Sequence, residues 1–165
     1  MNISALESGE LLELYSGVLG ELRRRGLVRI ANDPVGDLGV DLFCGSFAWT
    51  REGGSSGEFN ASTQAGARVL IKARRLTRGA APIRSGLIHD KDGFDILALA
   101  FFAADFSIYR AIVVQRNVAM RYLRWSKRQK GWYIVLSQRF WLDPEVEDAT
   151  VVLSTEHRRL MSWRS

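Results

Sequence analysis

Apolar side chains in the first part of the chain recur every three or four residues. From about Ser4 to Arg25 this spacing predicts one amphipathic helix. The predicted helix ends with three consecutive arginines followed by Gly26. Cations in the last turn interact favourably with the helix dipole, and glycine is typical of the residue that ends a helix. A second helix is predicted to begin at Pro34, capped by Asn32 or Asp33, and its glycines would permit close packing against a sheet.

The middle of the chain follows strand patterns instead. Strands are predicted near residues 58–63 and 68–75, joined into a hairpin by the turn "QAG", and the glycine- and serine-rich stretch 50–58 before them predicts a loop. Residues 94–115 predict two further strands around the turn "AADFS". The first of these is almost wholly apolar, as expected of a central strand covered on both faces.

The last third of the chain is patterned less clearly. Asn117 is predicted to cap a helix through about Trp125, and the stretch "GWYIVLS" predicts another strand. The tail is expected to contain short helical and extended pieces. Runs of strands with helices at their flanks predict an α/β (α+β) fold, a mixed central β-sheet flanked by helices, in a single domain over residues 1–165.

The charge balance is basic, and most of the positive charge is arginine. Lysine and arginine total 23 against 18 acidic residues, for a net charge of +5, and 19 of the 23 are arginine. Arginine binds phosphate bidentately, which favours a nucleic-acid partner, although a GC-rich genome produces the same bias. The single Cys44 suits a reducing cytoplasm, and we see no signal peptide and no apolar run long enough to cross a membrane. We therefore expect a cytoplasmic protein without a membrane partner.

Four short stretches, taken in order, suggest a family. They read "EFNA" (58–61), "LIKARRL" (70–76), "FDIL" (94–97) and "YRAIVV" (109–114), and the second places a lysine in the middle of a strand. This order resembles the PD-(D/E)xK nuclease superfamily, and most closely its small bacterial members. The resemblance implies a restriction-endonuclease-like core.

The resemblance also indicates which residues would do chemistry. Superfamily nucleases hold Mg²⁺ on carboxylates from the two hairpin strands, and a lysine assists the attacking water. The first acid of the motif falls on Asn60, the second on Leu70 and the lysine on Lys72. An amide and a leucine cannot replace two carboxylates, so we expect a degenerate site with no metal and no cofactor.

Two alternatives remain open for these positions. An active Mg²⁺-dependent DNA endonuclease could use migrated acids, with Asp37 from the helix and Glu58 from the first strand acting beside Lys72. If the resemblance is false, Leu70 simply packs, Asn60 bonds nearby backbone, and Lys72 extends along an apolar face to water.

A nuclease-like site that lacks its acidic residues still has its lysine and arginine side chains. These can hold a phosphate backbone without cutting it. A second basic cluster interleaves cations with Trp125, Trp132 and Tyr133, a composition that suits phosphate contact and base stacking. The alternative is a basic helix end whose tryptophans lie in the core. The residues predicted to bind nucleic acid are Arg68, Lys72, Arg74, Arg75, Arg121, Arg124, Lys127, Arg128 and Lys130.

The predicted function is therefore non-catalytic. The protein is expected to bind nucleic acid, DNA first and RNA as the alternative, or to act as an interaction subunit in a DNA-handling or defence-related assembly. A homodimer or a protein partner is compatible with this prediction. The alternative from another class is a protein-interaction module whose basic surface meets an acidic partner without binding nucleic acid.

Overall fold

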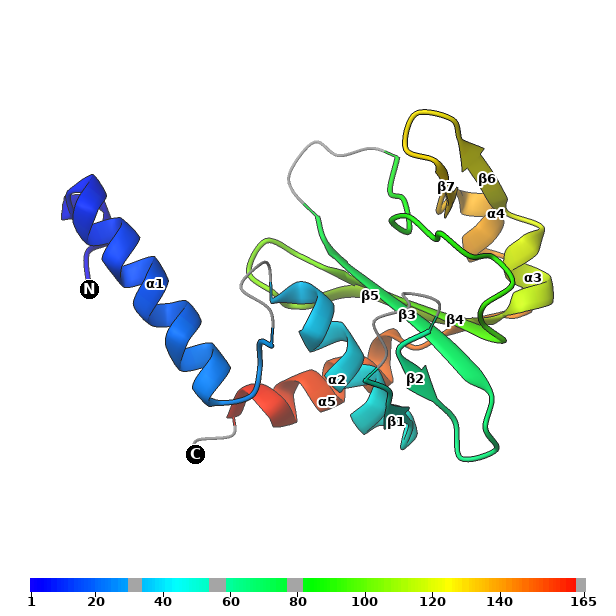
Figure 1. Cartoon of the computed structure of the whole chain (residues 1–165), viewed down its shortest axis with the longest axis horizontal. Coiled ribbons are helices and arrows are strands. Elements are labelled where there is room, and N and C mark those ends of the chain that lie inside the picture. The colour runs from blue at the N-terminus through cyan, green and yellow to red at the C-terminus, as the bar shows by residue number, and fades with distance from the viewer. Residues whose placement is uncertain (30–33, 54–58, 77–81, 163–165) are drawn as a thin grey trace.

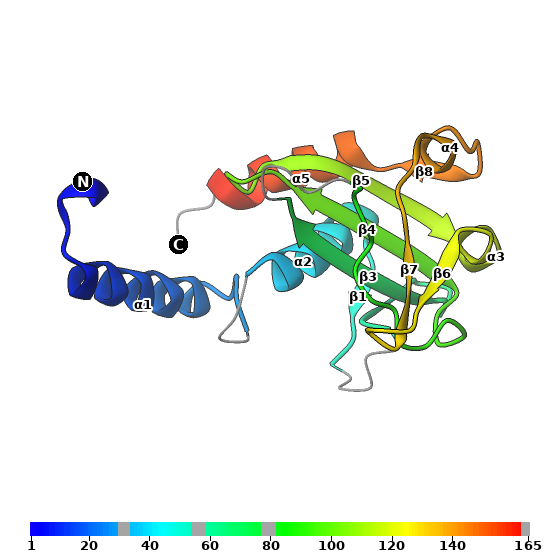
Figure 2. The ribbon, with the colours of Figure 1, turned by 90° about the horizontal axis from the view of Figure 1, so that it is seen from above.

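The computed structural model describes residues 1–29, 34–53, 59–76 and 82–162 (Figure 1). A short 3-10 helix, η1 (Ile3–Ala5), precedes helix α1 (Ser8–Arg24), whose amino end is closed by a capping box between Glu7 and Glu10. Gly26 adopts a positive φ of 73° just beyond the helix, as the sequence predicts. Helix α1 projects away from the rest of the chain (Figures 1 and 2), and none of its residues is buried.

A six-stranded mixed sheet forms the centre of the fold, as predicted. Its order is β1-β2-β3-β4-β5-β8, and every neighbouring pair is antiparallel except β3 and β4. The strands are β1 (Thr50–Arg51), β2 (Ala61–Ser62), β3 (Arg68–Arg75), β4 (Ile96–Phe102), β5 (Ile108–Gln115) and β8 (Val146–Asp148). All residues of β4 from Leu97 onward are buried, which confirms the prediction of a central strand covered on both faces.

Helices α2 (Val35–Phe47) and α5 (Thr150–Ser162) cover one face of the sheet. Helix α2 approaches β3 closely, because a Cβ built on Gly39 would lie 2.4 Å from Cβ of Ala73. The prediction that glycines let this helix pack tightly against a sheet is confirmed at Gly39. Pro34 directly precedes the helix, whereas the predicted caps Asn32 and Asp33 lie outside the described residues.

The other face is covered by shorter elements. They are α3 (Arg116–Met120), the hairpin of β6 (Leu123–Ser126) and β7 (Gly131–Ile134), and α4 (Gln138–Trp141). The crossover that leads from β3 to the parallel strand β4 joins this layer, since residues 83–88 run beside β7. Ser85 fixes the crossover, because its buried hydroxyl accepts a hydrogen bond from the Ile134 amide at 2.9 Å.

Several predicted elements differ from the structure. The helix predicted from Asn117 to Trp125 is wrong: α3 ends at Met120, and Trp125 lies in β6, packed edge-on against Trp132 with ring centroids 5.2 Å apart. Cross-strand aromatic pairing outweighs the weak helical propensity of this stretch. Residues 50–51 form an edge strand rather than loop, and the strand expected near 58–63 is shortened to Ala61–Ser62. The tail contains the short helix α4 and the short strand β8, as predicted, but it ends in the longer, 13-residue helix α5. In the described part of the chain, no helix is both long enough and apolar enough to cross a bilayer.

Candidate nucleic-acid interface

The pleat of β3 sorts its side chains onto two faces. Val69 and Ile71 point into the core beneath α2, and Leu70 points into the opposite core, beneath the β6–β7 hairpin layer. Leu70 is only 2% exposed and packs in the cluster that contains Phe94 and Leu97. The interpretation of Leu70 as a packing residue is confirmed. By alternation, Lys72 and Arg74 follow Leu70 on the hairpin side.

Asn60 uses its whole side-chain amide to bind the backbone of β3. Its Oδ1 accepts a hydrogen bond from the Ile71 amide at 2.8 Å, and its Nδ2 donates to the Ile71 carbonyl at 2.9 Å. The backbone amide of Asn60 also donates to the Val69 carbonyl of β3. The side chain therefore satisfies the next backbone groups along the edge of β3, which β2 does not reach. The interpretation that Asn60 bonds nearby backbone is confirmed.

Asp37 lies on the helix-covered side of the sheet and is engaged by an arginine. The Arg51 guanidinium donates to Asp37 and, at 2.7 Å, to Oδ1 of Asp41 one helical turn further on. Burial works against the charge of Arg51, but its bonds to the two aspartates outweigh burial and raise its pKa. Asp37 also accepts a hydrogen bond from the Arg29 amide at 2.9 Å.

The structure therefore does not bring Asp37 together with Lys72, because α2 and the Lys72 side chain occupy opposite faces of β3. Glu58, the other migrated acid, lies outside the described residues. Among the described residues, no group of three or more histidine, cysteine or acidic side chains is placed to hold a metal ion.

Lys72 is partly buried beside apolar neighbours. In the described part of the chain its ammonium makes no hydrogen bond and no ion pair. Burial lowers the pKa of Lys72, because the charged form loses hydration there. The position thus concentrates positive charge in the sheet at the cost of some stability.

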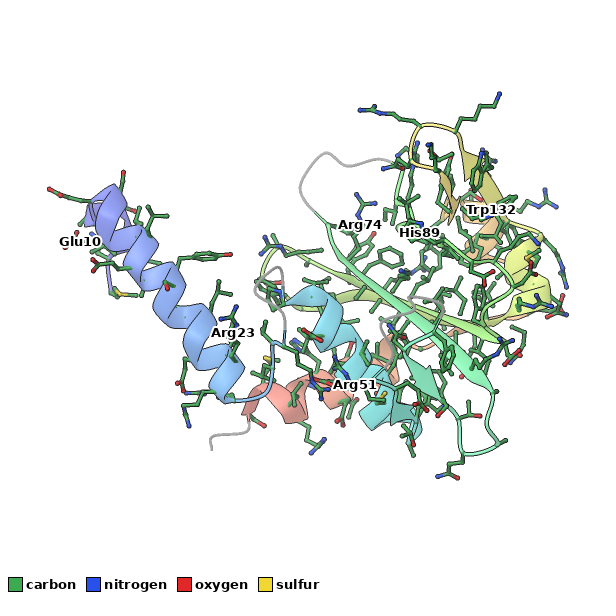
Figure 3. All side chains as sticks on the ribbon, viewed as in Figure 1. Glu10, Arg23, Arg51, Arg74, His89 and Trp132 are labelled. Atoms are coloured by element: carbon green, nitrogen blue, oxygen red, sulfur yellow. The ribbon has the colours of Figure 1, made fainter. Side chains whose placement is uncertain are left out.

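A small polar pocket opens one step further along the same face, where β3 meets the hairpin layer. Its volume is about 160 Å³, and its lining residues are Arg74, Arg84, Gly86, Leu87, Gln129 and Tyr133. We call it the Arg74–Arg84 pocket. The Arg84 guanidinium lies over the Tyr133 ring, 4.9 Å from its centroid, and Nη1 of Arg74 lies 3.4 Å from the Arg84 carbonyl. Figure 3 shows Arg74 on the side of β3 that faces the β6–β7 hairpin.

The hairpin carries further cations beside this pocket. Arg124 is the cross-strand neighbour of Tyr133, and Lys127, Arg128 and Lys130 flank Gln129 in the turn. All four are exposed, and none forms an ion pair with a described residue. Trp125 is 48% exposed on the same hairpin, but it pairs with Trp132 and therefore points to the face opposite Arg124 and Tyr133.

The other predicted cations lie elsewhere. Arg68 forms two side-chain bonds with Asp95 and lowers the pKa of that carboxyl to about 2. Arg121 bonds Glu145 at 2.5 Å. Arg75 points to the opposite face of β3, over the ring of Phe106 at 4.6 Å. The structure thus divides the predicted set. Arg74 lines the pocket, Lys72 precedes it on the same face of β3, and the hairpin cations neighbour the lining residues Gln129 and Tyr133.

Arg84 completes the pocket but is not predicted from sequence. It stands in a loop after Pro82, and it reaches the site only because its segment bonds to a strand about fifty residues later. No local pattern carries that information. In comparisons with known proteins, no family model and no curated protein matches the chain.

Proposed function

We propose that this protein binds nucleic acid, and DNA in the first instance, without cleaving it. The observation that carries the proposal is the convergence of Arg74, Arg84 and Tyr133 on one pocket, beside hairpin cations that form no ion pair with any described residue. A backbone phosphate seated there would meet two guanidinium forks, which bind phosphate oxygens bidentately. Lys72 lies on the same face of β3 as Arg74 and would add positive charge nearby.

The neighbouring residues support the proposed absence of cleavage. The two strand positions that resemble nuclease acids are engaged otherwise, since Asn60 binds the Ile71 backbone and Leu70 packs in the core. Asp37 lies across the sheet, bonded to Arg51. We therefore propose that the chain keeps the lysine of a PD-(D/E)xK-like strand as a phosphate contact within a DNA-handling or defence-related assembly.

The test is a titration of labelled duplex DNA with the full chain, followed by fluorescence anisotropy at several salt concentrations. We expect Arg74→Ala with Arg84→Ala to weaken binding roughly tenfold or more and to reduce the slope of log K against log salt by about 1 to 2. Arg158→Ala is the matched control, because Arg158 is an exposed arginine of α5 on the other side of the sheet.

Two results would overturn the proposal. One is DNA affinity that the pocket substitutions leave unchanged, which would place binding elsewhere; the other is no affinity for DNA at low salt. Plasmid nicking in Mg²⁺ that disappears in Lys72→Ala would show instead an active nuclease. Single-stranded RNA titrated in parallel distinguishes the two nucleic acids.

A further inference from the structure

Helix α1 presents an apolar face that nothing in the described part of the chain covers along most of its length. At about 100° per residue, its apolar side chains fall within an arc of roughly 160°. They are Leu11, Leu12, Leu14, Tyr15, Val18, Leu19 and Leu22. Leu12 is 69% exposed and Tyr15 is 60% exposed. A lone helix of this length is marginal in water, so a partner that covers this face would stabilise it.

We propose that α1 pairs in antiparallel orientation with α1 of a second copy of this chain. The charges along the helix favour this occupant and this orientation. The first half carries Glu7, Glu10 and Glu13, and the end carries three consecutive arginines, 23–25. Antiparallel pairing places the acidic half of each copy beside the arginines of the other and opposes the helix dipoles, whereas parallel pairing places like charges together.

The arginine nearest the start of this run is available for such a contact. Glu21 bonds both Arg24 and Arg25 within the helix, but Arg23 forms no ion pair with any described residue. With the two-fold axis near Tyr15, the end of one helix that carries Arg23 lies level with the acidic amino end of the other.

An apolar cavity at the base of α1 fits the same arrangement. It has a volume of about 530 Å³ and lies between the end of α1 and the end of α5, lined by Val18, Leu22, Leu27, Leu160 and Met161 among others. The apolar face of α1 runs into this cavity. The same two-fold axis places the amino end of the second copy's α1, preceded by η1 with the 55% exposed Ile3, beside the end of the first helix where the cavity opens. Each copy would thus set an apolar segment near the cavity of the other.

A membrane surface is the other common partner of an amphipathic helix, and α1 suits it less well. Helices that lie on anionic bilayers carry lysine and arginine along their polar face. The polar face of α1 carries Glu10, Glu13 and Glu21, and its cations are confined to the end. Those acids would oppose binding to anionic lipid, so the charges favour the second copy.

The test is sedimentation velocity of the full chain across a range of concentrations. We expect a dimer whose dissociation constant rises roughly tenfold or more in Leu12→Glu and in Tyr15→Glu. Both side chains are mostly exposed, so the fold should survive, which circular dichroism would verify. Gly20→Glu is the control, since it adds the same charge on the polar face, where an added Cβ meets nothing within 4 Å, and it should leave the dimer intact.

Orientation is tested by disulfide formation in a Cys44→Ser background. An antiparallel pair centred near Tyr15 sets Leu11 of one copy opposite Leu19 of the other. Chains carrying Leu11→Cys should therefore cross-link to chains carrying Leu19→Cys, and neither should cross-link to itself. Self-cross-linking of each variant alone would overturn the orientation, and a wild-type chain that stays monomeric, whether or not it binds anionic vesicles, would overturn the pairing.

The outcome does not depend on nucleic-acid binding. Helix α1 and the β6–β7 hairpin lie at opposite ends of the molecule (Figures 1 and 2), so each proposal fails or succeeds in its own assay.

Discussion

Replacement of Lys72 by methionine should make the protein more stable. The ammonium is partly buried, has no hydrogen-bond or ion-pair partner among the described residues, and has its pKa lowered by burial. Burying a polar group without a partner costs about 1–3 kcal/mol in proteins, and partial contact with water leaves Lys72 at the low end of that range. Methionine keeps the length of the side chain and fills the same space. We expect Lys72→Met to raise the free energy of unfolding by about 1 kcal/mol, which for a domain of this size raises Tm by about 2–4 °C.

The pH dependence of this gain has a definite sign. Because the pKa of Lys72 is lower in the folded state than in the unfolded chain, the unfolded state binds the proton more tightly. The cost of the lysine is therefore full below the folded-state pKa. It diminishes as the pH rises through the folded-state pKa toward the unfolded value of about 10.4. The advantage of Lys72→Met should shrink over the same range.

Urea unfolding followed by tryptophan fluorescence, at pH values between 7 and 10, measures both quantities. Lys127→Met is the matched control, because Lys127 is exposed and should give a change near zero at every pH. If Lys72→Met lowered the free energy of unfolding by 1 kcal/mol or more, the lysine would be making a stabilising contact. The reasoning about its burial would then be refuted.

Two other substitutions test the interpretation of the structural polar groups. Arg51→Met should lower the free energy of unfolding by about 2 kcal/mol, because it leaves the carboxylates of Asp37 and Asp41 close together and half-buried; urea unfolding should show at least half of the loss restored when both aspartates are also changed to asparagine. Asn60→Asp should cost about 1–2 kcal/mol at neutral pH, since a carboxylate oxygen would face the Ile71 carbonyl, and less in acid, where the protonated group can donate again; thermal unfolding at pH 7 and pH 4 would detect an unchanged cost, which would contradict this account.

The sheet could be predicted from sequence where the pattern is local. The alternation in β3 and the apolar run of β4 predicted both strands, and the glycines of α2 predicted its close approach to the sheet. The bonds of Asn60 to the Ile71 backbone and the partial burial of Lys72 depend on the packing of the sheet and are not encoded in the local sequence.

The remainder depends on contacts between distant segments. The stretch from Asn117 to Trp125 has a pattern that predicts a helix. Its second part forms a hairpin strand instead, because Trp125 packs against Trp132 of the neighbouring strand. The pairing of Arg51 with Asp37 across 14 residues is likewise invisible to periodicity, as is the arrival of Arg84 at the pocket. Sequence therefore predicted cations of the right type without predicting which of them meet.

The crossover that runs beside β7 ties the order of folding to the Arg74–Arg84 pocket. Arg74 and Arg84 leave the ribosome well before Gln129 and Tyr133, so the pocket cannot close until the hairpin has been synthesised. Until then the sheet face that carries Leu70 lacks the part of its cover that the hairpin provides. The hairpin, the crossover and the pocket should then form as one cooperative unit. Binding of a phosphate backbone should therefore slow amide hydrogen exchange at bonds that lie behind the pocket, such as the one from the Ile88 amide to the Trp132 carbonyl.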